Sequence, residues 1–347
     1  MKTYEIVIKP LSGFGTPLKG DTIFGHFCWQ IAHDEKLTGK SLDALLVNYP
    51  TKPFAVFSSA YPKFYIGDNH CYAFKTPSLP PDELFTFPED EDIKQRIEKR
   101  KEYKAKRWMI LEKNKRPLSI KKLKFLSDEA LFEDIKATIS EDARRRTKRA
   151  ELRNVIVPFS QFHNKINRIS GTTGMEGFAP FSMDQQVFLP ESELSIFVGI
   201  DETMITVEQI HAGLERIGLT GFGKDASTGL GRFEILGDNE IDLATMGCDS
   251  PNACYTLSPS VPERDTFSDM FFTPFTRFGR HGDVLAKSAN PFKNPVIMAN
   301  EGGIFKPKNE EVFRKPYIGT AVTNISKALP KSVAQGYSLY IPVNVEV

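Results

Sequence analysis

Four glycines at paired spacing, interrupted by hydroxyl and basic residues, mark the stretch where chemistry is expected. Leu219 to Phe233 reads Leu-Thr-Gly-Phe-Gly-Lys-Asp-Ala-Ser-Thr-Gly-Leu-Gly-Arg-Phe. Glycine permits positive φ and lets another backbone approach closely. The amides of such a loop, with positive charge beside them, can cradle a phosphate, although a plain tight turn is the alternative. The residues predicted to bind an anion here are Gly221, Gly223, Lys224, Ser227, Thr228, Gly229 and Arg232.

Two well-known phosphate-binding motifs nearly match this loop, and both are excluded by the elements around it. Gly218 to Asp225 reads G-x-x-x-x-G-K, but Asp225 stands where a magnesium-binding hydroxyl is required. Gly221 to Ala226 fits a loose dinucleotide fingerprint. Both motifs need a strand before the loop and a helix after it. Here residues 207–217 have helical spacing and residues 232–236 read as extended, so the order is reversed.

A helix, a Gly-Phe-Gly…Gly-Leu-Gly-Arg-Phe loop and a strand resemble the glycine-rich loop of the RAMP superfamily, the RNA-binding proteins of CRISPR systems. A second stretch, Leu18-Lys-Gly-Asp-Thr-Ile-Phe-Gly25, looks like the start of the first helix in the handle-binding RAMP subunit of the type III-A (Csm) effector. In that subunit the backbone at this point lies close to RNA, which implies Lys19 and Gly20 as RNA contacts. Asp21 is most simply an N-cap, and a direct functional role is the alternative.

Composition places the chain among ordinary globular proteins. Its 347 residues are 40% hydrophobic and 26% charged, and the formal net charge is +1. The length suffices for two domains. The four cysteines form no zinc-like spacing, no clustered carboxylates face a histidine, and no cofactor or metal is expected. We find no secretion signal and no apolar run of membrane length, so we expect a cytoplasmic protein with reduced thiols.

The order of elements predicts an α+β fold. Tyr4, Ile6 and Ile8 alternate as in a strand with one buried face, and a helix follows whose apolar positions run from Ile23 to Ile31. Further strands, the 207–217 helix and the final strand complete a β-α-β-β-α-β order. We predict a ferredoxin-like (RRM-like) domain over 1–240 with the glycine-rich loop at 219–233. By the resemblance, 241–347 form a degenerate second ferredoxin-like domain.

A strongly basic segment interrupts the first domain. Between Lys94 and Lys124 there are fourteen Lys or Arg and three acids, and a second basic cluster follows at 144–149. The mostly helical pattern predicts a basic helical insertion over about 88–150, packed on the outside of the domain. It is either a solvated face or a basic wall for an RNA backbone or a neighbouring subunit.

A polar hairpin or loop is predicted after the strand that begins at Asn154. Lys165, Asn167 and Arg168 precede a Gly-flanked Thr-Thr tip, and such a loop can reach across a nucleic acid. In the resembling subunit this region lies near a projecting hairpin, the thumb, which intercalates at a nucleotide of the guide RNA. Lys165, Asn167 and Arg168 are therefore predicted RNA contacts.

The resemblance implies a noncatalytic subunit of a type III CRISPR effector. Such a subunit binds the 5′ handle of the mature CRISPR RNA and joins the backbone RAMP subunit to the large polymerase-like subunit. It acts in antiviral defence, and no membrane partner is expected. Two alternatives stay open. One is a metal-independent CRISPR RNA-processing endoribonuclease with His26 or His163 as general acid or base. The other is the type III-B counterpart of the same subunit.

Overall fold

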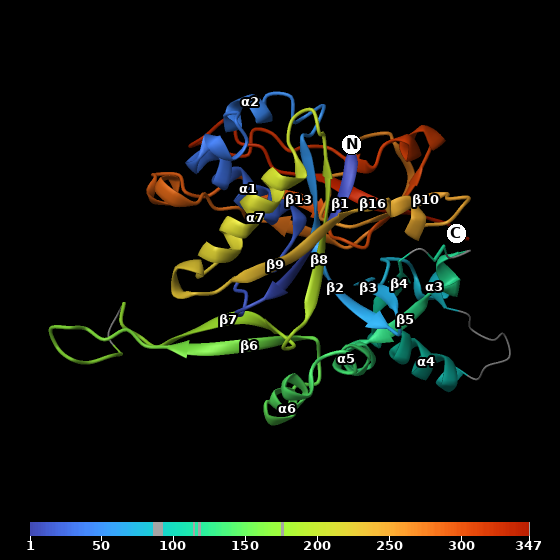
Figure 1. The fold of residues 1–347 in the computed structure, drawn as a ribbon, viewed down its shortest axis with the longest axis horizontal. Helices are drawn as coiled ribbons and strands as arrows, with labels where there is room; N and C mark the ends of the chain where they lie inside the picture. Colours follow the sequence, from blue (N-terminus) through green and yellow to red (C-terminus); the bar gives the residue numbers. More distant parts are fainter. Residues whose placement is uncertain (86–92, 114, 117–118, 175–176, 347) are drawn as a thin grey trace.

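A seven-stranded antiparallel sheet forms the centre of the computed structural model, which describes residues 1–85, 93–113, 115–116, 119–174 and 177–346. Its strands lie in the order β5-β4-β3-β2-β8-β1-β9 (Figure 1). Their bounds are β1 Lys2–Pro10, β2 Ala55–Ile66, β3 Asn69–Lys75, β4 Lys106–Glu112, β5 Lys124–Ser127, β8 Glu193–Ile200 and β9 Phe233–Glu240. The predicted α+β class is confirmed, and the paired strands of the sheets are antiparallel.

Two helices connect the central strands. Helix α1 (Gly20–His33) runs between β1 and β2, and helix α7 (Val207–Thr220) runs between β8 and β9. A capping box of Thr206 and Gln209 starts α7, and Gly221 ends it. In the sheet the four flanking strands lie in the order β9-β1-β8-β2. The glycine-rich loop therefore leaves a helix and enters an edge strand.

Strand β1 is covered on both faces, which differs from the expectation of one buried face. Tyr4, Ile6 and Ile8 are buried, but Glu5 and Val7 are buried as well. The Glu5 carboxylate accepts a hydrogen bond from Ser195 Oγ at 2.6 Å and lies 3.1 Å from Lys63 Nζ. A buried charge needs such partners, and sequence alternation alone cannot reveal them.

The C-terminal part adds a second antiparallel sheet in the order β11-β14-β10-β16-β15, and a two-stranded ribbon of β12 and β13. The bounds are β10 Ala253–Thr256, β11 Phe267–Phe271, β12 Pro274–Arg277, β13 Val296–Ala299, β14 Ile304–Pro307, β15 Tyr317–Gly319 and β16 Tyr337–Val343. After residue 240 the described chain has 3₁₀ turns, η4 Leu243–Met246, η5 Asp283–Lys287 and η6 Glu310–Arg314, but no α-helix. The apolar residues of this part of the sequence have only weak helical periodicity, which explains why short 3₁₀ turns form there.

The two parts pack on one main core. Buried residues of the central sheet and of strands β10 and β16 belong to the same hydrophobic cluster. Polar contacts cross the seam as well, since Tyr61 Oη donates to the Leu257 carbonyl at 2.8 Å and Tyr255 Oη to the Lys75 carbonyl at 2.6 Å. Thus the seam between residues 1–240 and 241–347 is a packed interface.

The predicted basic insertion contains strands as well as helices. Strands β4 and β5 extend the central sheet. Met109, Ile110 and Leu111 of β4 are buried, but the charged residues next to them in the sequence hide the strand pattern. The helices of this region are α3 Pro81–Leu84, α4 Ile93–Ala105, α5 Asp128–Lys136 and α6 Glu141–Arg149. Helix α4 has no buried residue, whereas α5 packs on the sheet through Leu131 and Phe132. Residues 88–92, 114 and 117–118 of the predicted insertion lie outside the described residues.

Strands β6 (Ile156–His163) and β7 (Phe181–Phe188) form a hairpin that projects far from the sheet (Figure 1). Remaining short elements near the N-terminus are η1 Glu35–Leu37, α2 Leu42–Leu46 and η2 Ile120–Lys122. Within the described ranges no helix is long and apolar enough to cross a membrane.

Candidate nucleic-acid interface

The glycine-rich loop is a tightly folded connection from α7 to β9, with one 3₁₀ turn, η3 (Ala226–Thr228). Gly221, Gly223, Gly229 and Gly231 all have positive φ. The need for glycine is strictest at Gly231, where φ is +75° and an added Cβ would lie 2.2 Å from the Phe222 carbonyl oxygen. The glycines therefore fold the loop back on itself.

Most amides of this loop are already used within the chain. The backbone N–H groups of residues 221–224 and 228–232 all donate to protein atoms. The Gly223 amide, for example, donates to His26 Nε2 at 3.2 Å. The expected open cradle of amides is thus wrong for these residues. Ligand recognition at the loop has to come mainly from its side chains.

The loop nevertheless presents polar side chains to solvent. Lys224, Ser227, Thr228 and Arg232 are exposed, as is Gly229. Lys224 Nζ lies 3.8 Å from the Asp225 carboxylate, while Arg232 Nη2 donates to the Leu219 carbonyl at 2.7 Å. These two cations and two hydroxyls are suited to phosphate or sugar contacts without base specificity.

The loop rests on residues 11–18, the turn that follows β1. Lys224 N donates to Thr16 Oγ1 at 2.9 Å, and Gly231 N donates to the Gly13 carbonyl at 2.7 Å. The same turn holds the base of the projecting hairpin, because Phe14 and Gln186 exchange backbone hydrogen bonds of 2.8 and 2.9 Å. The glycine-rich loop, the 11–18 turn and the hairpin base thus form one hydrogen-bonded surface.

Lys165, Asn167 and Arg168 lie in the loop that joins β6 to β7. Lys165 and Arg168 are exposed, and Lys165 Nζ lies 5.5 Å from the centre of the Phe181 ring. Asn167 shapes the turn instead, since its Oδ1 accepts from Ile169 N at 2.9 Å. Lys224 and Arg232 belong to a different loop, so the structure spreads the predicted cations over two elements.

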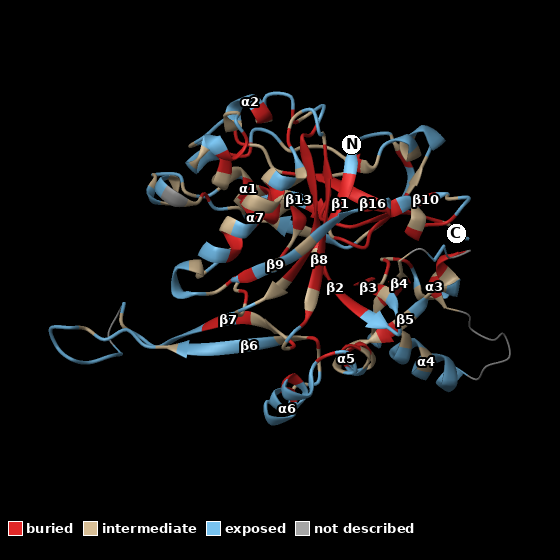
Figure 2. Cartoon of the chain, in the orientation of Figure 1, coloured by how far each residue is buried: buried red, intermediate tan, exposed pale blue. Residues whose placement is uncertain are grey.

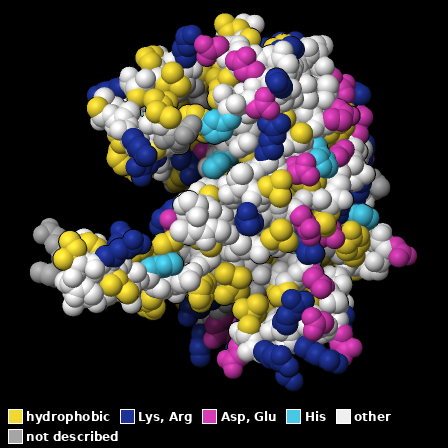
Figure 3. All heavy atoms as spheres, turned by 60° about the vertical axis from the view of Figure 1, so that its left-hand side comes forward, with side chains coloured by type: hydrophobic (Ala, Val, Ile, Leu, Met, Phe, Trp, Pro, Cys, Tyr) yellow, Lys and Arg dark blue, Asp and Glu magenta, His cyan; other side chains and the backbone are white. Residues whose placement is uncertain are grey.

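The hairpin also exposes large apolar side chains that the sequence analysis did not single out. Ile169 is 99% exposed and Phe162 is 83% exposed, with Ile166 and Phe159 also open to solvent. Figure 2 shows most of β6 and of the loop that joins it to β7 in the exposed colour, whereas β7 is partly buried, and Figure 3 shows basic and hydrophobic side chains together on the hairpin. Apolar and basic side chains on a projecting arm are suited to stacking against bases and contacting phosphates.

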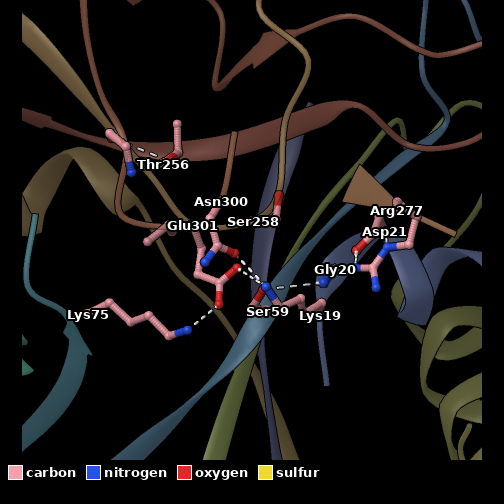
Figure 4. Close-up of polar contacts among 12 residues, drawn as sticks. Lys19, Gly20, Asp21, Ser59, Lys75, Thr256, Ser258, Arg277, Asn300 and Glu301 are labelled. Carbon is pink, nitrogen blue, oxygen red and sulfur yellow. Dashed lines mark hydrogen bonds and ion pairs between the residues drawn. The ribbon is translucent and has the colours of Figure 1, made fainter. Parts of the chain in front are cut away.

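Lys19 and Gly20 lie at the seam between the two parts (Figure 4). Lys19 Nζ is 2.5 Å from Asn300 Oδ1 and 3.2 Å from the buried Glu301 carboxylate, and burial lowers the Lys19 pKa. Glu301 Oε1 in turn lies 2.6 Å from Lys75 Nζ. A Cβ on Gly20 would lie 2.2 Å from the Phe57 carbonyl oxygen. Both residues therefore have packing roles here.

Asp21 does not cap its helix, contrary to expectation. Helix α1 begins at Gly20, and its N-cap is Lys19, with no side-chain cap. The Asp21 carboxylate accepts two hydrogen bonds from Arg277 of β12. The Asp21 carboxylate therefore pairs with a cation from residues 241–347 and accepts no capping hydrogen bond from the amides of its own helix.

The two histidines considered for acid or base chemistry lie on separate elements. His26 packs its ring on Phe222 with centres 4.5 Å apart, and burial lowers its pKa to about 4. His163 ends β6 and stacks on Phe181 at 5.5 Å. His33, the last residue of the same helix as His26, is exposed. The described part of the chain has no cluster of three or more metal-ligating side chains, and its four cysteines are free thiols.

Comparison with known proteins gives matches of structure only. No family model matches the sequence, and no curated protein matches it significantly. A chain of the Csm1–Csm4 cassette in complex with AMPPNP matches with a TM-score of 0.53 and 15% identity over 100% of both chains. A chain of the Csm3–Csm4 subcomplex of the type III-A CRISPR-Cas interference complex matches with a TM-score of 0.53 and 14% identity, over 99% of this chain and 100% of that one.

Csm4 is the component common to these complexes, and the matches extend over whole chains. At 14 to 15% identity these matches show that the chain shares its fold with a chain of each of these complexes. A further Csm1–Csm4 cassette, in complex with pppApA, matches with a TM-score of 0.52 and 15% identity over 100% of this chain and 99% of that one. The resemblance inferred from the glycine-rich loop and the first helix is confirmed at the level of the fold. Within this shared fold, the roles of the predicted RNA-binding residues stay predictions.

Proposed function

We propose that this chain is a noncatalytic RNA-binding subunit of a type III CRISPR effector ribonucleoprotein. In this role it binds the 5′ handle of the mature CRISPR RNA and links the backbone RAMP subunit to the large polymerase-like subunit. Support for the partners comes from the shared fold with chains found in complexes with Csm1 and with Csm3.

The observation that carries the proposal is the continuous surface of the glycine-rich loop, the 11–18 turn and the hairpin base. Lys224 and Arg232 on the loop and Lys165 and Arg168 on the hairpin supply charge for the phosphates of a single strand. The exposed Phe162 and Ile169 supply faces against which unstacked bases can pack. One strand of RNA crossing from the loop to the hairpin would use both.

The domain division is part of the same proposal. Strands in the order β9-β1-β8-β2 with helices α1 and α7 support a ferredoxin-like domain over residues 1–240, interrupted by the basic insertion. Residues 241–347 would be a second, degenerate domain in which short 3₁₀ turns replace the helices.

Recovery of the tagged chain from its native host, followed by sequencing of the bound small RNAs, tests the proposal. We expect spacer-bearing RNAs that share a short repeat-derived 5′ end, together with a large subunit and a backbone subunit. Random RNA fragments, or no RNA, would reject handle binding.

The noncatalytic character has its own test. The His26 imidazole accepts a hydrogen bond from the Gly223 amide, and a pKa of about 4 leaves it neutral near pH 7, where it cannot act as a general acid. We expect the purified chain to leave repeat RNA intact without metal. Site-specific cleavage that disappears in a His26→Gln or His163→Gln variant would instead identify a processing endoribonuclease.

A further inference from the structure

A cavity of about 710 Å³ lies where three parts of the fold meet. The end of strand β3 contributes Lys75, the basic insertion contributes the segment from Tyr103 to Trp108, and the base of the projecting hairpin contributes Gln186. Binding sites for small ligands commonly have volumes of about 300 to 1,000 Å³. The cavity is therefore large enough for a nucleotide-sized group.

The lining of this cavity carries excess positive charge. Among the described residues that line it, the cations are Lys75, Lys104, Lys106 and Arg107, and the carboxylate is that of Asp128. Asp128 is already engaged, because it accepts from Trp108 Nε1 at 2.7 Å and lies 3.4 Å from Arg107. The Arg107 side chain is still 72% exposed. Lys75 pairs with Glu301 at 2.6 Å and Lys106 with Glu102 at 3.1 Å. The charge offered to an anionic ligand therefore comes mainly from the exposed side chains of Lys104 and Arg107.

Flat apolar groups line the same cavity. The rings of Phe85 and Tyr103 are stacked with centres 4.0 Å apart and planes 5° from parallel, and Lys106 Nζ lies 4.7 Å from the Tyr103 centre. Trp108 is fixed in place by its bond to Asp128. Aromatic faces beside cations are the combination with which proteins hold single-stranded nucleic acid.

The cavity adjoins the proposed RNA surface at Gln186 and the seam between the two parts at Lys75. Gln186 pairs with Phe14 in the turn under the glycine-rich loop. On the other side Lys75 shares Glu301 with Lys19 at the seam (Figure 4). A strand lying across the hairpin base would therefore reach this cavity without leaving the protein surface.

We propose that this cavity holds one nucleotide of the bound single-stranded RNA, an inference that rests on the proposed function. The base would lie against the aromatic lining at Tyr103 and Trp108, and its phosphate would meet Lys104 and Arg107. This assigns the insertion a role in RNA binding. The continuity with the hairpin base favours RNA over an acidic segment of a protein partner.

The test uses the full-length chain with a short single-stranded oligoribonucleotide. The chain has two tryptophans, so a Trp29→Phe background leaves Trp108 as the sole reporter. We expect the RNA to quench the emission of Trp108. Lys104→Glu combined with Arg107→Glu should weaken binding at least about tenfold, a change of about 1.4 kcal/mol or more, and abolish the quenching. Lys36→Glu combined with Lys327→Glu makes the same charge change at two exposed residues outside the insertion, the hairpin and the glycine-rich loop, and should change affinity less than about twofold.

Each outcome separates the two proposals. If Lys224→Glu weakens RNA binding but the Lys104 and Arg107 pair does not, the proposed function stands and the cavity proposal fails. An unchanged Trp108 emission at saturating RNA also overturns the cavity proposal. If the double variant keeps its RNA affinity and loses a protein partner, the cavity is a protein-docking site. If the unmodified chain binds no single-stranded RNA, both proposals fail.

Discussion

Arg277 and Asp21 form a two-pronged ion pair across the seam, with Nε at 2.6 Å and Nη2 at 2.8 Å from the two carboxylate oxygens. The Asp21 side chain is 6% exposed and that of Arg277 is 28% exposed. Since the residues are 256 positions apart in sequence, the pair ties the first helix to the β12–β13 ribbon. Removing the cation from a buried ion pair of this kind strongly destabilises the fold, because the carboxylate charge stays buried without a partner.

Arg277→Met should lower the free energy of unfolding by about 3 to 5 kcal/mol, because it leaves the Asp21 charge buried and unpaired. Denaturant unfolding measures this value. Adding Asp21→Asn should recover part of the loss, since it removes the orphaned charge. Arg280→Met, at an exposed position in the segment that joins β12 to β13, is the control and should cost about 0.5 kcal/mol or less. Equal effects of the two arginine variants would contradict the buried pair.

Lys19→Met should act on stability more than on RNA binding. The change leaves Glu301 with Lys75 alone and removes the bond to Asn300, at a cost of about 1 to 3 kcal/mol. Burial would raise the Glu301 pKa, but Lys75 and Lys19 hold it below its usual value. RNA affinity of the folded variant should change less than about twofold. A large loss of RNA affinity with unchanged unfolding would restore Lys19 as a direct contact.

Gly231→Ala should damage the glycine-rich loop much more than Gly229→Ala. Both residues have positive φ, which costs a side-chain-bearing residue about 1 to 2 kcal/mol. An added Cβ at Gly229 meets open space, whereas at Gly231 it meets the Phe222 backbone. Thermal unfolding of the two variants tests this order, and equal losses would mean that the loop backbone differs from that described.

Lys224→Glu should weaken RNA binding at all salt concentrations and reduce the slope of log affinity against log salt by about one. The reason is that an exposed lysine on the loop neutralises one phosphate and releases its counterion. Lys36→Glu, exposed on η1, makes the same charge change away from the loop. Identical salt slopes for the two variants would show that Lys224 does not contact RNA.

Local patterns in the sequence were sufficient for the fold class and for the position of the glycine-rich loop. The α7 helix and the start of β9 follow from apolar spacing and from the glycines that end the helix. Strands β4 and β5 were missed, because Lys106 and Arg107 beside Trp108 make their alternation look like part of a basic helix. Tertiary packing against β3 decided that segment.

The candidate site was harder to predict, because its partners are distant in sequence. Lys19 was expected at RNA but pairs with Glu301, and Asp21 was expected at the helix amides but pairs with Arg277. The loop amides are used by residues of the 11–18 turn and by His26. These hydrogen bonds could have been predicted only from the knowledge that residues 11–18 lie beside the glycine-rich loop in space. A single sequence carries no signal for such long-range pairing.

His26 should make stability depend on pH between about 4 and 6.5. Burial lowers its pKa from 6.5 to about 4, so in that window the unfolded chain binds a proton that the folded chain does not. The free energy of unfolding therefore has its full value, as far as His26 is concerned, above pH 6.5. It decreases as the pH falls, by about 2 to 3 kcal/mol at pH 4.5. Denaturant unfolding at pH 7 and pH 4.5 measures this difference.

His26→Gln supplies the comparison, because the glutamine oxygen can still accept the Gly223 amide but takes up no proton. The variant should lose less stability than the unmodified chain between the two pH values. His33→Gln, on the exposed end of the same helix, should keep the full dependence. If His26→Gln and the unmodified chain lose the same stability, then His26 is not held neutral beneath the glycine-rich loop, and the loop must be open enough there to admit water.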